Sequence, residues 1–328
     1  MSNPWSDLLA NTQTGFPSPE ETGLYPITHI QTIRVSGPDS AKFMQGQFSC
    51  NLTEVNGDQF KRGSCCNAKG RMITSFSVAK TDDDYLLTMD AGLVESSLAH
   101  LKKYMVFFKT QMTPSDWVLA GLKGAKADSL LSKLFGSAPM EDYQQVNSEM
   151  GLAIKLPFDA GYELWLKPET ATDTLNSLMK ECPLAPEQAW INNLIQHGLG
   201  YLTPETQASL IPQMMNLGVT GGISFNKGCY TGQEIVARMQ YLGKLKRHGY
   251  VFKAASTDIA SGAGVFTADK ESSIGEVLNV AAIENSDHSL LFAVVEDKYL
   301  EQTLSIGSNN GPSLELLSLP YDPIDSSS

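Results

Sequence analysis

The hydrophobic pattern changes near Leu245, and this change limits the fold more than any other feature of the chain. Before Leu245, runs of alternating apolar residues are mixed with segments whose apolar residues recur at helical spacing. After it, short β-type runs at 249–253, 274–280 and 289–295 lie between clusters of Gly, Ser, Asp and Asn. Such runs are typical of a small antiparallel sheet or barrel. We therefore predict an α+β protein with a β-rich barrel domain at 246–328.

The region before this boundary is predicted to combine strands and helices. Leu98, Leu101 and Met105 recur at helical spacing, so residues 93–108 are expected to form an amphipathic helix. The start of the chain is polar and rich in Asn, Thr, Ser and Pro, so we expect a loose lead-in at 1–26 and the main folded region at 27–245. Other helices are expected at 38–44, 126–135, 168–182 and 186–197, and strands at 30–35, 72–78, 85–89, 117–122, 152–156 and 162–166.

The net charge, the apolar runs and the cysteines bear on nucleic-acid binding, membrane insertion and cellular compartment. The 328 residues carry a formal net charge of -12, whereas broad binding of nucleic acid needs a basic face. Any contact with RNA is therefore expected to be indirect or confined to a local basic patch. No run approaches the ~20 apolar residues of a membrane span. The five cysteines are odd in number and irregularly spaced, and no secretory leader precedes them, which favours reduced thiols in the cytoplasm.

The segment 224–247 contains the candidate reactive thiol. Thr231 and Glu234 are three residues apart before an apolar run, a spacing typical of a capping box. With Thr231 as the N-cap, Cys229 precedes a helix by two residues, where the helix dipole and the ammonium of Lys227 favour a thiolate. The same residues also fit a tight turn with a small packed thiol, and both interpretations stay open on local features alone.

Neither the adjacent cysteines nor the histidines are predicted to form a redox or metal site, and a structural role is expected for the cysteines. Cys65 and Cys66 are adjacent, lack the spacing of a C-x-x-C redox motif, and lie on an expected strand. The five histidines are scattered without the ligand spacing of a zinc site, so no bound metal or cluster is predicted.

The residues 227–234, K-G-C-Y-T-G-Q-E, resemble the K-G-C-Y-x-G-Q-E signature of the YgfZ folate-binding family. Three further segments resemble the same family: the strand and helix at 33–47, the K-G-R turn at 67–71, and the I-P-Q-x-x-N-L approach at 211–217. The resemblance extends from about 27 to 247 and, more weakly, to the end of the chain. It implies the aminomethyltransferase arrangement of three subdomains around a central opening that holds tetrahydrofolate, with two interleaved subdomains in 27–245.

The resemblance also implies a function and a set of contacts. The family supports iron–sulfur enzymes, notably those that methylthiolate tRNA, so iron–sulfur radical tRNA-modifying enzymes are the expected partners. Trp190 matches a folate-contacting tryptophan of the family, although a Trp on the apolar face of a helix is typical of a core. Further expected folate contacts are Gln196, Tyr230, Gln233 and Arg238. The basic residues Arg238, Lys244, Lys246 and Arg247 are candidates to attract the anionic glutamate tail of folate, or form a solvated basic face.

The sequence departs from the related aminomethyltransferases at functional positions. Their I-L-D-D carboxylates match residues 72–75, Met-Ile-Thr-Ser, so ordinary aminomethyl transfer is not expected. Gln196 stands where those enzymes have a glutamate, and Ile30 where some family members have an aromatic residue. The leading hypothesis is a folate-binding accessory protein in which Cys229 is a required thiol. The alternatives are a folate-dependent one-carbon transferase and a ligand-free interaction protein on the same fold.

Overall fold

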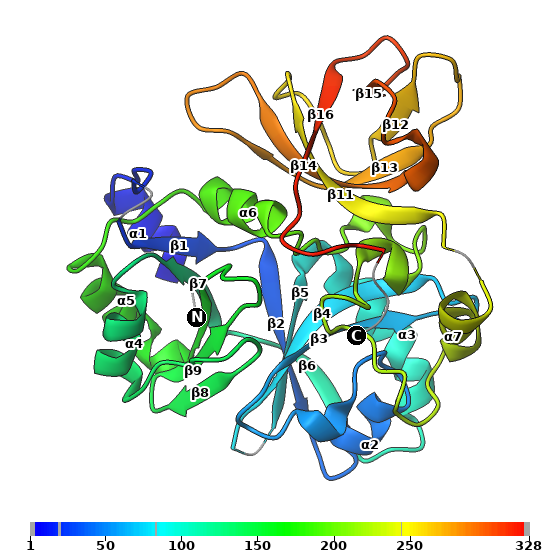
Figure 1. Cartoon of the computed structure of the whole chain (residues 1–328). Coiled ribbons are helices and arrows are strands. Elements are labelled where there is room, and N and C mark those ends of the chain that lie inside the picture. Colours follow the sequence, from blue (N-terminus) through cyan, green and yellow to red (C-terminus); the bar gives the residue numbers. More distant parts are fainter. Residues whose placement is uncertain (1–3, 19–20, 83, 244, 325–328) are drawn as a thin grey trace.

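The computed structural model describes residues 4–18, 21–82, 84–243 and 245–324. These residues form two five-stranded antiparallel sheets and a closed six-stranded barrel, with helices packed around them (Figure 1). The α+β class and the C-terminal barrel that we predicted are confirmed. Short 3-10 helices connect the larger elements at Leu52–Glu54, Ala91–Leu93, Pro204–Thr206, Pro212–Met215 and Asp297–Tyr299.

The first sheet has the strand order β3-β4-β5-β2-β6. Its core contains Phe76 from the strands, Phe43 and Leu101 from two helices, and Phe48 from the turn that follows the first of these helices. Helix α3 packs against β4 and β6 because its apolar face follows the helical period. The elements are β2 (Ile30–Ser36), α2 (Ser40–Gln45), β3 (Lys61–Cys66), β4 (Met72–Lys80), β5 (Tyr85–Asp90), α3 (Val94–Met105) and β6 (Gln111–Ser115).

The second sheet has the order β1-β7-β10-β9-β8, and β1 precedes all strands of the first sheet in the sequence. The chain therefore starts in one sheet, crosses to the other at Thr28 and His29, and returns at β7. Helices α4 and α5 cover its outer face (Figure 1). The elements are α1 (Pro4–Asn11), β1 (Gly23–Ile27), β7 (Val118–Lys123), α4 (Ala127–Phe135), β8 (Gln145–Ser148), β9 (Gly151–Lys155), β10 (Tyr162–Leu166) and α5 (Pro168–Met179).

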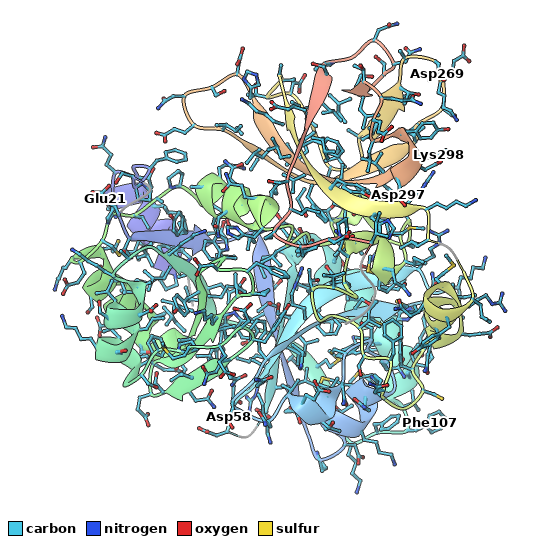
Figure 2. All side chains as sticks on the ribbon, in the orientation of Figure 1. Glu21, Asp58, Phe107, Asp269, Asp297 and Lys298 are labelled. Atoms are coloured by element: carbon cyan, nitrogen blue, oxygen red, sulfur yellow. The ribbon has the colours of Figure 1, made fainter. Side chains whose placement is uncertain are left out.

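Helix α6 (Glu187–Gln196) lies between the second sheet and the barrel, in contact with β1, β13 and β14. At the barrel edge, Oδ1 of Asp297 accepts hydrogen bonds from His248 (2.8 Å) and Tyr250 (3.0 Å) (Figure 2). Helix α6 thus contacts the second sheet through β1 and the barrel through β13 and β14. The remaining elements are α7 (Gln233–Tyr241), β11 (Arg247–Ala254), β12 (Gly264–Thr267), β13 (Gly275–Ala282), β14 (Ser289–Glu296), β15 (Leu304–Ile306) and β16 (Ser313–Leu317).

The expectation of a loose lead-in at 1–26 is wrong for the described residues. Pro4–Asn11 forms helix α1 and Gly23–Ile27 forms strand β1. Trp5 is buried at 1% exposure in the core of the second sheet, and its Nε1 donates to the carbonyl oxygen of Leu119 at 2.7 Å. One large side chain on a helix of two turns fixes this segment without producing a periodic pattern in the sequence.

Candidate functional site

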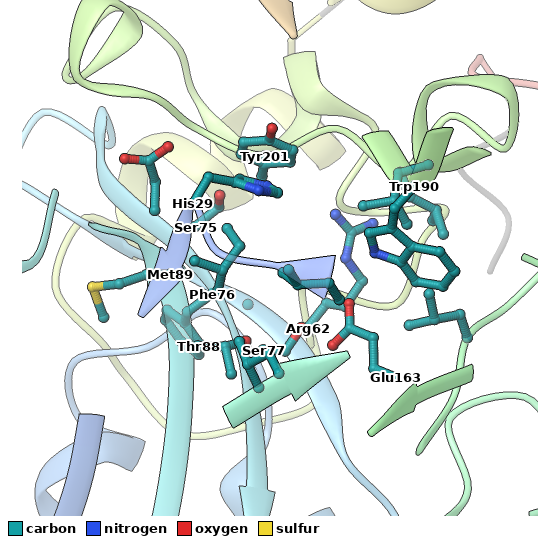
Figure 3. Close-up of a pocket in the computed structure, with 18 of the residues that line it drawn as sticks. His29, Arg62, Ser75, Phe76, Ser77, Thr88, Met89, Glu163, Trp190 and Tyr201 are labelled. Atoms are coloured by element: carbon teal, nitrogen blue, oxygen red, sulfur yellow. The ribbon is translucent and has the colours of Figure 1, made fainter. Parts of the chain in front are cut away.

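A narrow cavity lies between the two sheets, beneath helix α6 (Figure 3). Its free volume is ≈ 60 Å³. The walls come from the β1–β2 connection, from strands β3, β4, β5, β7 and β10, from α6 and from the chain after α6. Segments that are distant in the sequence therefore form the cavity together. The lining side chains include His29, Ile30, Arg62, Asp90, Leu119, Glu163, Trp190 and Tyr201.

Trp190 forms one wall of this cavity and is fully buried on α6. Its ring lies against Gly121 of β7, where an added Cβ atom would come within 2.5 Å of the indole. The ring of Tyr25 lies 5.4 Å from it, centroid to centroid. The indole Nε1 is buried and has no hydrogen-bond partner among the residues that the structure describes. Trp190 therefore serves as core, as its helix position suggests, and also presents an unused donor at the cavity.

Two charged groups of opposite sign face the cavity from neighbouring sheets. The guanidinium of Arg62 on β3 donates to the carbonyl oxygen of Gly200 at 2.6 Å and to Oγ1 of Thr220 at 3.2 Å. The carboxylate of Glu163 on β10 accepts from Nε1 of Trp165 at 3.0 Å. Burial raises the pKa of Glu163 and lowers that of Arg62, because each charged form loses solvation. In Figure 3, Arg62 lies between His29 and Trp190, with Glu163 nearby.

His29 lies at the crossing between the sheets and is held by Glu187, in the first turn of α6. Its Nδ1 is 2.8 Å from Oε1 of Glu187, and its ring centroid is 5.2 Å from that of Tyr201. Glu187 also accepts from both backbone nitrogens of Thr28 and His29 and from Oγ1 of Thr28. Burial favours the neutral acid, but these hydrogen bonds outweigh it and lower the pKa of Glu187 to about 2.

The predicted pairing of Lys227 with Cys229 is wrong. Nζ of Lys227 donates to three backbone carbonyl oxygens, those of Gln45 (2.9 Å), Phe48 (2.6 Å) and Cys50 (2.8 Å). All three ammonium hydrogens are therefore used to hold the turn that follows α2. Burial lowers the pKa of Lys227 to about 8. Cys229 is exposed, in contrast to the other four cysteines, which are buried.

The predicted capping box is also wrong. Helix α7 begins at Gln233 and its N-cap is Gly232, with φ +86° and no side-chain cap. Oγ1 of Thr231 instead donates to Oε1 of Gln47 at 3.1 Å, and Glu234 pairs with Arg238 at 3.2 Å on the exposed face. Gly232 adopts this conformation because it packs on the 67–70 turn, where a Cβ atom would lie 2.6 Å from the carbonyl oxygen of Asn67.

Most of the expected folate contacts lie away from the central cavity. Gln196 is exposed and lines a separate surface cleft of ≈ 770 Å³ that also contains Lys123 and Asp159. Gln233 accepts from the backbone nitrogen of Tyr230 at 3.2 Å, which is a structural contact. Of the basic group, Arg238 and Lys246 are exposed, Arg247 pairs with Glu296 at 3.0 Å, and Lys244 lies outside the described residues. Of the expected set, Trp190 and Ile30 line the cavity.

The sequence did not predict four polar residues at or beside the cavity: His29, Arg62, Glu163 and Glu187. They come from four separate segments, and no local spacing relates them. Cys65 and Cys66 are both buried on β3, and burial raises the pKa of Cys66 to about 12, in keeping with a structural role. Within the described ranges, no group of three or more His, Cys, Asp or Glu could hold a metal ion. No helix there has the length and apolar character needed to cross a membrane.

Comparison with known proteins relates this geometry to one family. Residues 19–184 match the GCVT N-terminal domain. The chain is 30% identical over 298 residues to the tRNA-modifying protein YgfZ of Pectobacterium carotovorum subsp. carotovorum (strain PC1), covering 88% of both chains. It is 31% identical over 297 residues to YgfZ of Escherichia coli O45:K1 (strain S88 / ExPEC), covering 88% of this chain and 89% of that one.

The fold has a solved counterpart. The glycine cleavage system aminomethyltransferase T from Bartonella henselae superposes with a TM-score of 0.76 at 17% identity, covering 97% of this chain and 96% of that chain. This likeness confirms the aminomethyltransferase-like arrangement that we expected. The chain belongs to the YgfZ family of tRNA-modifying proteins.

Proposed function

We propose that this protein binds a tetrahydrofolate in the central cavity and acts as an accessory to tRNA modification in the cytoplasm. One observation supports the site above all others. Nε1 of Trp190 and Nε2 of His29 are both buried without a hydrogen-bond partner among the described residues, and both residues line the same cavity. Buried polar groups without a partner are rare, and a ligand that supplies both partners accounts for them.

The residues of the cavity fit a pterin ring. A pterin has several N–H donors and a carbonyl oxygen on one flat heterocycle. The carboxylate of Glu163 and Nε2 of His29 supply acceptors, whereas Arg62 and the indole N–H of Trp190 supply donors. Leu119 and Ile30 add apolar surface. Because the free volume is only ≈ 60 Å³, the lining side chains must move apart when a ring enters. A bound tetrahydrofolate would supply a one-carbon unit carried on N5 of its ring, on the linker nitrogen N10, or on both.

The accessory function is favoured over ordinary aminomethyl transfer by the β4 strand. Its residues Met72 to Ser75 carry no carboxylate, and Oγ of Ser75 already accepts from the backbone nitrogen of Leu202 at 2.8 Å. One observation favours the alternative of a one-carbon transferase: Asp90 lines the cavity, and burial raises its pKa. A carboxylate at that place could accept a proton from an attacking amine.

The link to tRNA comes from the relatives, which are named tRNA-modifying proteins, and the net charge of the chain favours an indirect link. With a net charge of -12, the chain is poorly suited to bind tRNA over a broad surface. We therefore propose that it acts through iron–sulfur radical tRNA-modifying enzymes, with exposed Cys229 as its reactive group. Loss of methylthiolated tRNA in a strain that lacks the protein, restored by the wild-type gene but not by Cys229→Ala, would support this. Full restoration by Cys229→Ala would exclude the thiol.

Folate binding is tested by titrating the purified protein with tetrahydrofolate and its 5-formyl derivative, followed by Trp fluorescence and heat. Trp190→Phe keeps an aromatic ring at this position but removes the indole N–H donor, so we expect about tenfold weaker binding. Trp117→Phe, outside the cavity, is the matched control and should bind as the wild type does. Absence of binding by the wild-type protein would overturn the folate site. Consumption of a folate one-carbon species with an amine or thiol acceptor would favour the transferase.

A further inference from the structure

The pair His29–Glu187 has the geometry of an imidazole supported by a carboxylate. His29 is in the short crossing between β1 and β2, and Glu187 is in the first turn of α6, so the contact ties α6 to both sheets. Four groups donate to the Glu187 carboxylate, including Nδ1 of His29 at 2.8 Å and Oγ1 of Thr28 at 2.7 Å. The imidazole is therefore fixed in position and orientation, and Tyr201 packs on its face.

This geometry determines which nitrogen carries the proton. The hydrogen bonds keep Glu187 ionised, and an ionised carboxylate can only accept. Nδ1 must therefore be the protonated nitrogen. In the neutral ring, Nε2 then carries a lone pair and is an acceptor. Nε2 is buried without a partner among the described residues, and His29 lines the central cavity.

We propose that His29 is the proton acceptor of the central cavity and that Glu187 is its positioning residue. Nε2 accepts a hydrogen bond from an N–H or O–H group of the bound folate. When that group gives up its proton, its bond to hydrogen breaks, the electron pair stays on the ligand, and a new Nε2–H bond forms. Glu187 then offsets the charge of the imidazolium. The identity of the ligand rests on the proposed function; the state of the imidazole does not.

Charged groups face His29 from both sheets and from α6. Three carboxylates lie near His29 on three different elements, a fourth carboxylate lies near one of these three, and one guanidinium opposes them from β3. Tyr201, on the chain after α6, adds a ring without charge. The groups are Glu187 on α6, Asp90 at the end of β5 with Glu205 near it, Glu163 on β10, and Arg62 on β3.

The first test needs no ligand. The ¹⁵N chemical shifts of the imidazole ring, assigned with His29→Gln, show which nitrogen is protonated in the neutral form. We expect Nδ1–H in the wild-type protein. In Glu187→Ala we expect a shift to Nε2–H, the form that a free side chain prefers, whereas Glu205→Ala should leave the spectrum unchanged. An Nε2–H tautomer in the wild type would overturn the proposal.

The second test measures affinity for 5-formyltetrahydrofolate from pH 8 to pH 5, the range in which imidazoles take up a proton. A protonated Nε2 cannot accept, so wild-type affinity should fall by about tenfold across this range. His29→Gln should bind about tenfold more weakly at pH 8 and show no such decline. Parallel curves for the two proteins would overturn the proton-acceptor assignment and leave folate binding intact. If the wild type binds no folate at any pH, the proposed function fails, and the tautomer measurement alone decides on the His29–Glu187 pair.

Discussion

The indole of Trp190 lies so close to Gly121 that a single added methyl group would come within 2.5 Å of its ring. Gly121 is in the middle of β7, and Trp190 forms one wall of the central cavity. The absence of a side chain at one position of the second sheet therefore sets the position of a cavity residue on α6.

Gly121→Ala is expected to displace the indole and disturb both packing and the cavity. Overpacking of this kind costs about 1–3 kcal/mol in the free energy of unfolding, measured by urea denaturation. Folate affinity, measured by calorimetry, should fall with it. Gly228→Ala is the control, because a Cβ atom there meets nothing within 4 Å. Equal free energies of unfolding for the two variants would contradict this expectation and show that α6 moves to make room for the added methyl group.

Lys227→Met should destabilise the protein, because three carbonyl oxygens lose their shared ammonium donor. We expect a loss of about 3 kcal/mol in the free energy of unfolding. Lys69→Met, which removes an exposed lysine of the neighbouring turn, should have little effect. The alkylation rate of Cys229 should be the same in the folded Lys227→Met variant, since Lys227 is used elsewhere. A large fall in that rate would instead support the pairing of the Cys229 thiol with the Lys227 ammonium that the sequence suggested.

Iodoacetamide should label Cys229 in the native protein well before any other cysteine. Cys229 is exposed, while burial raises the pKa of Cys50 to about 12 and that of Cys182 to about 11, so their thiolates are scarce at neutral pH. Peptide mass spectrometry after partial labelling measures the order. Cys229→Ala should remain unlabelled over the same time. Early labelling of Cys182 would instead indicate that the second sheet opens locally.

Glu187→Gln should destabilise the protein at neutral pH and much less in acid. The folded pKa of Glu187, about 2, is below its ordinary value of about 4.3, so its stabilisation is fully present above the ordinary value. It is lost as the pH falls through about 2. We expect a difference of about 1–3 kcal/mol at pH 7 that narrows between pH 4.5 and pH 3. Thermal unfolding at several pH values measures it. A difference independent of pH would mean that the carboxylate charge does not matter.

Most of the element order follows from local patterns in the sequence. Helical spacing at Leu98, Leu101 and Met105 predicted α3, and the short β-runs after Leu245 predicted the barrel, because both patterns arise from the local geometry of the backbone. The family also followed from the sequence, since the K-G-C-Y-T-G-Q-E segment is contiguous. Trp190 as a cavity residue followed only from the resemblance, not from its spacing on α6.

The candidate site, in contrast, depends on the tertiary structure. The chain crosses between two sheets and α6 packs on the crossing, which brings together His29, Arg62, Glu163 and Glu187. No local periodicity in the sequence predicts such a contact. The same reason explains the errors around the signature. The carbonyl oxygens that accept from Lys227 are distant in the sequence from both Lys227 and Cys229. Helix α7 starts at Gln233 because contact with a distant turn requires glycine at 232. Local patterns specify elements, whereas the partners of a charged or polar group depend on contacts distant in the sequence.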